Sequence, residues 1–287
     1  MQRAEQKSAT VWGLDIRYVE AGDGPVVVLL HGLAASLLTW YCNIDVLAGA
    51  GYRVIAPDLP GYGDSDKPSH LDYSPDSAAD FVYDFSQELG LEKFSLVWSS
   101  AGGLIAGLFA LEHPDMVEKL VLVGSGGFGR EVAWFLRVIS VPVLGELLYQ
   151  PWLNTKMGAT KYLFHRPPAI LEELLPEMDR HKMLPGARTA MLRSIRSSIN
   201  LWGLRKQGLI LDRLKGSEVP LMTVWGAEDI IIPVAHAEAV RRELPHSIVH
   251  VIPECGHWPQ MERPDEFNFM LTGFLSDGPI QIDQPGS

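Results

Sequence analysis

One short stretch, Val97 to Gly103, constrains the fold more than any other part of the sequence. An apolar run from Phe94 leads into it, and a segment with apolar residues at helical spacing, Leu104 to His113, follows it. Pro114 then ends the helical pattern. The order is strand, sharp turn, helix, and a serine at the tip of such a turn projects where nearby N–H groups favour negative charge. We therefore expect a nucleophile here.

Glycine spacing favours Ser100 over Ser99 as that nucleophile. The usual pattern is G-x-S-x-G, because the residues two before and two after the serine approach closely in the turn. Gly102 lies two residues after Ser100, while the position two before it holds Trp98. Reading Ser99 as the nucleophile leaves both following glycines without a purpose. An ordinary helix start with capping serines is the alternative without chemistry.

Strand and helix patterns alternate through most of the chain. A hairpin around Gly13 is followed by short apolar runs typical of strands buried on both faces. The sequence predicts strands at 26–30, 53–56, 94–97, 119–123, 221–225 and 247–252, and helices at 36–50, 77–89 and 104–113. Such alternation indicates an α/β protein with a doubly wound, mostly parallel sheet.

The alternation stops between residues 128 and 215. Helical segments separated by prolines replace the strand pattern there, and strands return only at Leu221. We expect residues 1–127 and 216–287 to form one core, and residues 128–215 to form a helical lid inserted into it. Residues 280–287 have the character of a loose tail.

Composition limits the partners of the chain. The 287 residues carry a net charge of −11, which argues against nucleic acid as a partner. Two cysteines, Cys42 and Cys255, cannot build a disulfide framework, and no metal-ligand spacing occurs, so no metal is expected. The first ten residues lack a signal-like apolar run, and no segment is long enough to span a bilayer. We therefore predict a cytoplasmic protein without a membrane span, and leave a homodimer open.

Two further residues follow predicted strand ends, as Ser100 does. Asp229 comes after the strand at 221–225, and His257 after the strand at 247–252. The carboxyl ends of parallel strands gather at one edge of a sheet, so these three side chains should meet. An imidazole activates a serine hydroxyl, and a carboxylate fixes the imidazole tautomer. The chain order Ser, Asp, His supports a catalytic triad, with Glu228 as a weaker alternative acid.

The chain resembles the lid-bearing members of the α/β-hydrolase fold. The matching residues are His31-Gly32, Pro60-Gly61-Tyr62-Gly63, Ser100-Ala101-Gly102-Gly103, Trp225-Gly226 with Asp229, and Gly256-His257-Trp258-Pro259 with Glu262-Arg263-Pro264. The resemblance implies a structural role for His31, an oxyanion hole formed by the backbone N–H groups of Leu33 and Ala101, and no cofactor. Dehalogenases and epoxide hydrolases of this fold use aspartate as nucleophile, so Ser100 favours acyl chemistry.

These features predict that the chain is a serine esterase. It would cleave carboxylic esters of apolar acyl or alcohol groups through an acyl-enzyme on Ser100, without a cofactor. A pocket under the lid is expected to involve Trp98, Trp134, Phe135, Val138 and Trp258. Plain packing between lid and core is the other reading of the apolar lid residues.

Two alternatives stay open. One is a C–C bond hydrolase of ring-cleavage diketo acids, which the chain resembles at Gly256-His257-Trp258 and Asp265-Glu266-Phe267. Residues 128–215 hold 14 Lys and Arg against 7 Asp and Glu, and arginines such as Arg188, Arg193 and Arg196 could either bind a substrate carboxylate or cover the surface. The other alternative is a slow or non-catalytic small-ligand-binding protein, suggested by Trp98.

Overall fold

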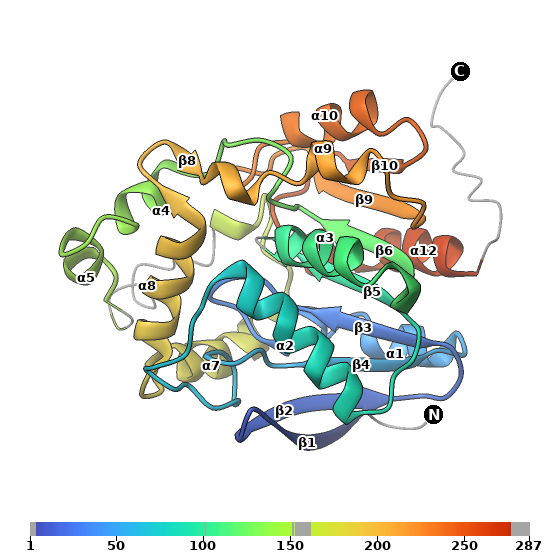
Figure 1. The fold of residues 1–287 in the computed structure, drawn as a ribbon, viewed down its shortest axis with the longest axis horizontal. Helices are drawn as coiled ribbons and strands as arrows, with labels where there is room; N and C mark the ends of the chain where they lie inside the picture. The colour runs from blue at the N-terminus through green and yellow to red at the C-terminus, as the bar shows by residue number, and fades with distance from the viewer. Residues whose placement is uncertain (1–3, 101, 151, 153–161, 277–287) are drawn as a thin grey trace.

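An eight-stranded sheet forms the centre of the computed structural model, which describes residues 4–100, 102–150, 152 and 162–276 (Figure 1). The strand order is β1-β2-β4-β3-β5-β6-β9-β10. Strand β2 pairs antiparallel with β1 and with β4, and all other neighbours are parallel. The bounds are β1 (Glu5–Val11), β2 (Leu14–Ala21), β3 (Val26–Leu30), β4 (Arg53–Pro57), β5 (Phe94–Ser99), β6 (Val117–Val123), β9 (Leu221–Gly226) and β10 (Ile248–Ile252). The predicted α/β class with a mostly parallel sheet is confirmed.

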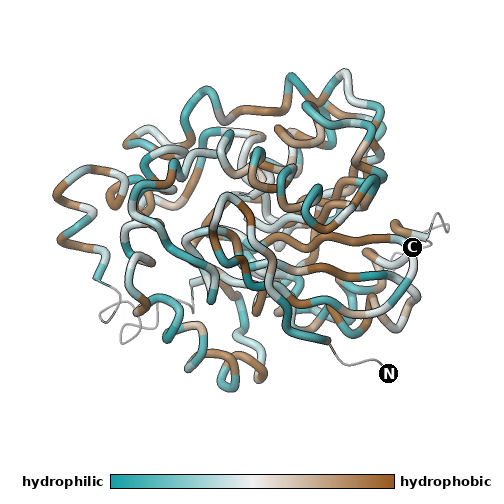
Figure 2. Tube along the Cα trace, turned by 60° about the horizontal axis from the view of Figure 1, so that its bottom comes forward, coloured by the Kyte–Doolittle hydropathy of each residue, from teal (hydrophilic) through white to brown (hydrophobic). Residues whose placement is uncertain are grey.

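Helices cover both faces of the sheet. Side chains of α1 (Ile44–Gly49) and α12 (Pro264–Leu275) share one apolar cluster with the strands. Those of α2 (Pro75–Glu88), α3 (Gly102–Glu112) and α10 (Ala235–Glu243) share another on the opposite face. Figure 2 shows the central strands as hydrophobic tubes between more polar surface segments. Burial on both faces explains why these strands are continuous apolar runs.

The segment 36–50 differs from the single helix expected there. It contains a short 3-10 helix, Leu37–Trp40, followed by a turn and then α1. Asn43 stands between the two helices, and its buried side chain donates to Gln260 O (3.1 Å) and to Asn268 Oδ1 (2.8 Å). These tertiary hydrogen bonds interrupt a pattern that local spacing alone would continue.

Residues 128–215, called the insertion below, leave the sheet after β6 and return before β9. They include α4 (Trp134–Ile139), α5 (Leu144–Leu148), α7 (Ile170–Met183), α8 (Ala187–Ser198) and α9 (Leu211–Leu214). A two-stranded ribbon, β7 (Ile199–Asn200) with β8 (Gly203–Leu204), was missed because strands of two residues show no periodicity. The insertion's identity as a separate lid stays a prediction.

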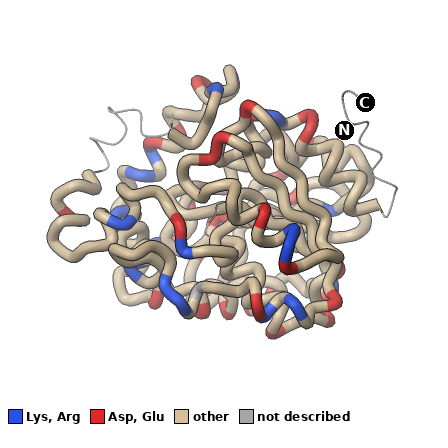
Figure 3. Tube along the Cα trace, turned by 90° about the horizontal axis from the view of Figure 1, so that it is seen from above, with Lys and Arg blue, Asp and Glu red and all other residues tan. Residues whose placement is uncertain are grey.

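The insertion differs from the rest of the molecule in charge. Figure 3 shows Lys and Arg spaced along it, on the side away from the two termini, and more Asp and Glu over the remainder.

Among the described helices, none combines the length and the apolar character needed to cross a bilayer. The short helix α11 (Pro259–Glu262) follows β10 and carries the chain into α12.

Candidate active site

Ser100 stands at the turn between β5 and α3 with a φ of 65°, a conformation that is strained for a residue other than glycine. Three backbone hydrogen bonds hold it there. Its N–H donates to Val123 O (2.8 Å), and its carbonyl accepts from the N–H groups of Gly103 and Gly126 (both 3.1 Å). The tight strand-to-helix turn predicted from the glycines is therefore present, and it presents the Ser100 hydroxyl at the edge of the sheet.

His257 and Asp229 meet Ser100 at that edge. His257 Nε2 lies 2.7 Å from Ser100 Oγ, and His257 Nδ1 lies 2.7 Å from Asp229 Oδ2. The other carboxylate oxygen, Oδ1, accepts the backbone N–H groups of Ile231 (2.8 Å) and Ile232 (2.9 Å). Asp229 therefore favours the tautomer with hydrogen on Nδ1, which leaves Nε2 free to accept the serine proton. All three residues are buried.

The alternative residues have other partners. Ser99 Oγ accepts from Gln260 Nε2 (3.3 Å), and a Glu228 carboxylate oxygen accepts the N–H of Cys255 (2.8 Å). A Cβ added to Gly124, just past β6, would lie 3.2 Å from both Asp229 Oδ2 and His257 Nδ1. No side chain competes with Asp229 from that position.

The loop after β3 runs beside Ser100. A Cβ added to Gly32 would lie only 2.6 Å from Ser100 Cβ, so only glycine allows this approach. Leu33 follows and lines a cavity together with Ser100. Its N–H as an oxyanion donor stays a prediction, and the other predicted donor, Ala101, lies outside the described residues.

His31 holds this loop in place. Its Nε2 accepts the N–H of Leu59 (3.0 Å), so Nδ1 carries the hydrogen and donates to Gly32 O (2.8 Å). Burial lowers the pKa of His31, which favours this neutral form. These contacts agree with the structural role that the resemblance implies.

A cavity of about 190 Å³ opens above Ser100 and His257. Of the residues predicted for a substrate pocket, Phe135 and Trp258 line this cavity. Trp134 and Val138 do not, and Trp134 is 72% exposed. Trp98 is fully buried and lines a different cavity, because its side chain points to the sheet face covered by α2 and α3. Apolar side chains supply most of the lining, among them Leu33, Val132, Leu136, Ile139, Met178, Met191, Ile199, Leu204, Ile231 and Ile232.

The arginines considered as carboxylate binders have protein partners. Arg188 donates to the carbonyls of Tyr149 (3.0 Å) and Glu146, and Arg196 forms an ion pair with the Glu146 carboxylate (2.5 Å). Arg193 donates to Leu71 O (3.3 Å). Within the described part of the chain, no arginine lines the cavity, whereas Lys182 does. The sequence placed Lys182 in a basic run but gave no signal that it reaches the site.

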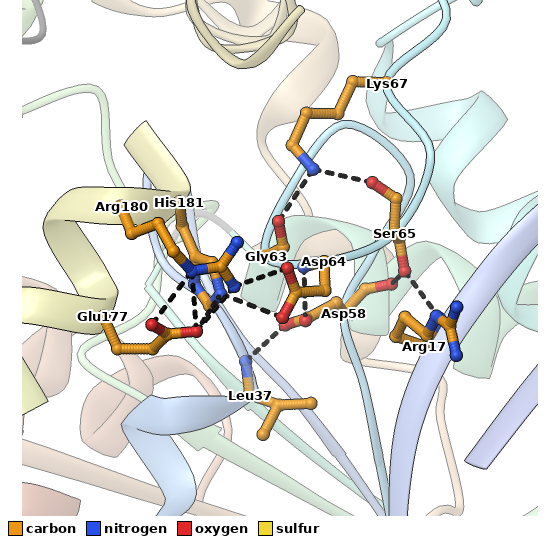
Figure 4. Close-up of polar contacts among 10 residues, drawn as sticks. All are labelled: Arg17, Leu37, Asp58, Gly63, Asp64, Ser65, Lys67, Glu177, Arg180 and His181. Carbon is orange, nitrogen blue, oxygen red and sulfur yellow. Dashed lines mark hydrogen bonds and ion pairs between the residues drawn. The ribbon is translucent and has the colours of Figure 1, made fainter. Parts of the chain in front are cut away.

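Helix α7 contacts the loop after β4 through a charged group that we call the seam: Asp64, Glu177, Arg180 and His181 (Figure 4). Arg180 lies 2.6 Å from Asp64 Oδ1 and 2.5 Å from Glu177 Oε1, and His181 Nε2 lies 3.3 Å from Asp64 Oδ2. Its hydrogen bonds to Arg180 lower the pKa of Glu177. The two acids and the histidine are close enough to hold a cation together, but the Arg180 guanidinium already pairs with both carboxylates, so the group is an ion-pair contact.

A further contact ties the His257 loop to the insertion. The His257 N–H donates to Leu163 O (2.7 Å). Glu262 Oε2 accepts the N–H groups of Gly256 (2.8 Å) and His165 (3.2 Å). The sequence placed Glu262 in a motif, but its partners on the insertion are nearly 100 residues away, and no local spacing could identify them.

Comparison with known proteins agrees with this geometry. The family model described as the alpha/beta hydrolase fold matches residues 25–264. The 2-hydroxy-6-oxononadienedioate/2-hydroxy-6-oxononatrienedioate hydrolase of Comamonas testosteroni is 31% identical over 265 residues, which cover 90% of each chain.

Two solved structures are similar over most of their length. A meta-cleavage product hydrolase from Pseudomonas fluorescens has a TM-score of 0.80 at 25% identity, covering 94% of this chain and 97% of its own. A membrane phospholipase A described as a bacterial virulence factor has a TM-score of 0.79 at 27% identity, covering 96% of this chain and 86% of its own. The match over most of the chain, the strand order and the sharp turn at Ser100, which we call the elbow, show that the chain belongs to the α/β-hydrolase fold family.

Proposed function

We propose that the protein hydrolyses carboxylic esters with apolar acyl or alcohol groups. The observation that carries this proposal is the continuous hydrogen-bonded series from Asp229 through His257 to Ser100, which ends in a mainly apolar cavity. A serine hydroxyl bonded to an oriented imidazole nitrogen that can accept its proton is equipped to attack a carbonyl carbon.

The reaction would proceed in two halves. Ser100 Oγ attacks the ester carbonyl while His257 Nε2 takes its proton, and the negative oxygen that forms is directed toward the Leu33 N–H. His257 then returns the proton to the departing alcohol, which leaves the acyl group on Ser100. A water molecule repeats the sequence, with His257 again as base, and releases the carboxylic acid and the free serine.

The lining of the cavity supports apolar substrates. Leu, Ile, Val, Met and Phe side chains surround Ser100, and several come from the insertion. We include in this proposal the division of the chain into a core and a lid at residues 128–215, since the lid would then supply most of the substrate contacts. Burial of an apolar substrate portion would contribute about 25 cal/mol per Å².

A C–C bond hydrolase of ring-cleavage diketo acids is the second candidate. One observation favours it: a relative covering 90% of this chain has a name of that kind. Lys182 also lines the cavity, but its ammonium already pairs with Asp179 (3.0 Å), so a substrate carboxylate would have to compete with that acid. Against it stands the absence of any lining arginine among the described residues. A planar guanidinium binds a carboxylate through two hydrogen bonds, which an ammonium cannot do.

Turnover of two substrates separates the candidates. We expect the wild type to hydrolyse p-nitrophenyl butyrate faster than a 2-hydroxy-6-oxo-dienoate, and Ser100→Ala to abolish both activities. A strong preference for the dienoate, reduced by Lys182→Gln but not by the control Lys206→Gln on the exposed surface of the insertion, would establish the second candidate instead. No turnover of either substrate, with no labelling of Ser100 by a fluorophosphonate, would favour a non-catalytic binding protein.

A further inference from the structure

Trp98 occupies the position two before Ser100, where this fold usually has glycine. We propose that its indole is a positioning residue for the oxyanion loop, His31 to Leu33: the Nε1–H of Trp98 holds the loop backbone so that the Leu33 N–H faces the carbonyl under attack. The inference rests on the proposed hydrolase function, and it adds a residue to the machinery of that site.

The contact on which this depends is a single buried hydrogen bond. Trp98 Nε1 donates to His31 O at 2.8 Å, and the Trp98 side chain is fully buried. Trp98 is paired with Leu30 across the parallel strands β5 and β3, so the indole reaches one residue beyond the end of β3. A buried carbonyl that loses its donor is left unsatisfied, which is unfavourable, so this bond strongly favours one placement of the loop.

The indole fits because Gly102 has no side chain. A Cβ added to Gly102 would lie 1.4 Å from Trp98 Nε1 and 1.7 Å from Cδ1. The bulk at position 98 is therefore accommodated by the glycine two residues after the nucleophile. The elbow keeps its left-handed Ser100, and the tryptophan connects the start of α3 with the oxyanion loop.

Two consecutive peptide planes are fixed before the Leu33 N–H. Trp98 binds the carbonyl of the His31–Gly32 peptide, and His31 Nδ1 binds the carbonyl of the Gly32–Leu33 peptide. In a planar trans peptide the N–H points opposite to the carbonyl, so fixing Gly32 O also fixes the direction of the Leu33 N–H. The Trp98 bond sets the plane on which this second bond depends. A glycine at position 98 would supply no donor.

The test compares two buried tryptophans. Trp98→Phe removes the indole N–H and keeps an aromatic ring. Trp40→Phe is the matched control, since Trp40 is also fully buried, on the other face of the sheet, and its Nε1 has no hydrogen-bond partner among the described residues. For each variant, the measurements are the melting temperature, kcat and KM for p-nitrophenyl butyrate, and the rate at which a fluorophosphonate labels Ser100.

We expect Trp98→Phe to lower kcat and the labelling rate by about tenfold to a hundredfold, because small displacements of a catalytic group have effects of that size. KM should change little, because the bond acts on the transition state. A trifluoromethyl ketone, which forms an oxyanion on Ser100, should lose affinity by a similar factor relative to the unfluorinated ketone. Trp40→Phe should leave kcat, the labelling rate and the ratio of the two ketone affinities unchanged.

Other results have defined meanings. If Trp98→Phe lowers only the melting temperature, and kcat, the labelling rate and the ketone ratio match those of wild type, Trp98 is a packing residue and the inference is overturned. Should Trp98→Phe fail to fold, β-(3-benzothienyl)alanine at position 98 keeps the shape and replaces the N–H with sulfur. If wild type is labelled but hydrolyses no ester, the esterase proposal fails while the labelling ratios still decide the role of Trp98. If wild type is not labelled at all, both fail.

Discussion

The elbow around Ser100 and the seam between α7 and the core are both polar, yet they are built differently. Around Ser100 the groups are buried, and backbone N–H and carbonyl groups make many of the contacts. In the seam, the side chains of Asp64, Glu177 and Arg180 are 46%, 45% and 43% exposed and contact one another through flexible ends. Electrostatic interactions are stronger away from water, whereas exposed ion pairs contribute little. Substitutions should therefore have much larger effects at the elbow than at the seam.

The largest effect should come from Ser100, the proposed nucleophile. We expect Ser100→Ala to lower turnover of p-nitrophenyl butyrate by roughly four to six orders of magnitude, as for other triad serines. Ser99→Ala, which removes a hydroxyl bonded to Gln260 instead of His257, should retain much of the activity. Labelling of Ser99 by a phosphonate would contradict this assignment.

Packing around the elbow should give the next largest effect. Gly102→Ala places a methyl group inside the Trp98 indole, and overpacking of this kind costs typically 1–3 kcal/mol and sometimes more. In a Trp98→Gly background the same change should cost far less, and denaturant unfolding of the four proteins measures this coupling. Gly49→Ala is the control, because a Cβ added there meets no atom within 4 Å. Equal costs in both backgrounds would show that the two residues do not compete for space.

Acid should weaken the fold through buried and half-buried histidines. Burial lowers the pKa of His31, His236 and His250 below the ordinary 6.5. Near pH 6.5 these histidines take up protons in the unfolded chain but not in the folded chain. Their contribution to the free energy of unfolding is therefore fully present above pH 6.5 and is lost as the pH falls below it.

Unfolding free energies at pH 7.5 and 5.5 test the share of His31. His31→Gln should reduce the loss between the two pH values, and His70→Gln, at an exposed position, should not. An unchanged pH dependence in His31→Gln would mean that this imidazole titrates alike in the folded and unfolded chain.

The smallest effect is expected at the seam. Asp64→Asn should lower the free energy of unfolding by about 1 kcal/mol or less, and the difference should shrink in high salt. Asp80→Asn, an exposed acid on α2, serves as the control for the loss of one negative charge. If Asp64→Asn lowered the free energy of unfolding by several kcal/mol, the seam would contribute as much to stability as the elbow does.

The same contrast explains what could be predicted from sequence. Strands such as β5 and β9 are buried on both faces, so their apolar runs are visible, and the residues just past them must converge at one edge. That was enough to bring Ser100, Asp229 and His257 together. It was not enough to find the partners of Arg188 or Arg196, because long side chains bind whichever acceptors the fold brings within reach. The role of Trp98 was hidden because its partner, His31 O, is a backbone atom 67 residues away.

The hydrogen bond from the His257 N–H to Leu163 O has a consequence for engineering. A Cβ added to Gly256 would lie within 2.8 Å of backbone atoms from residues 163–165, so the two segments interlock without spare room. Replacing the insertion with one from a relative would reshape the cavity, and it would also move the support of the imidazole. A chimera that changes specificity must therefore reproduce the path of these three residues, because the insertion that lines the cavity also supports the backbone of His257, the proposed base.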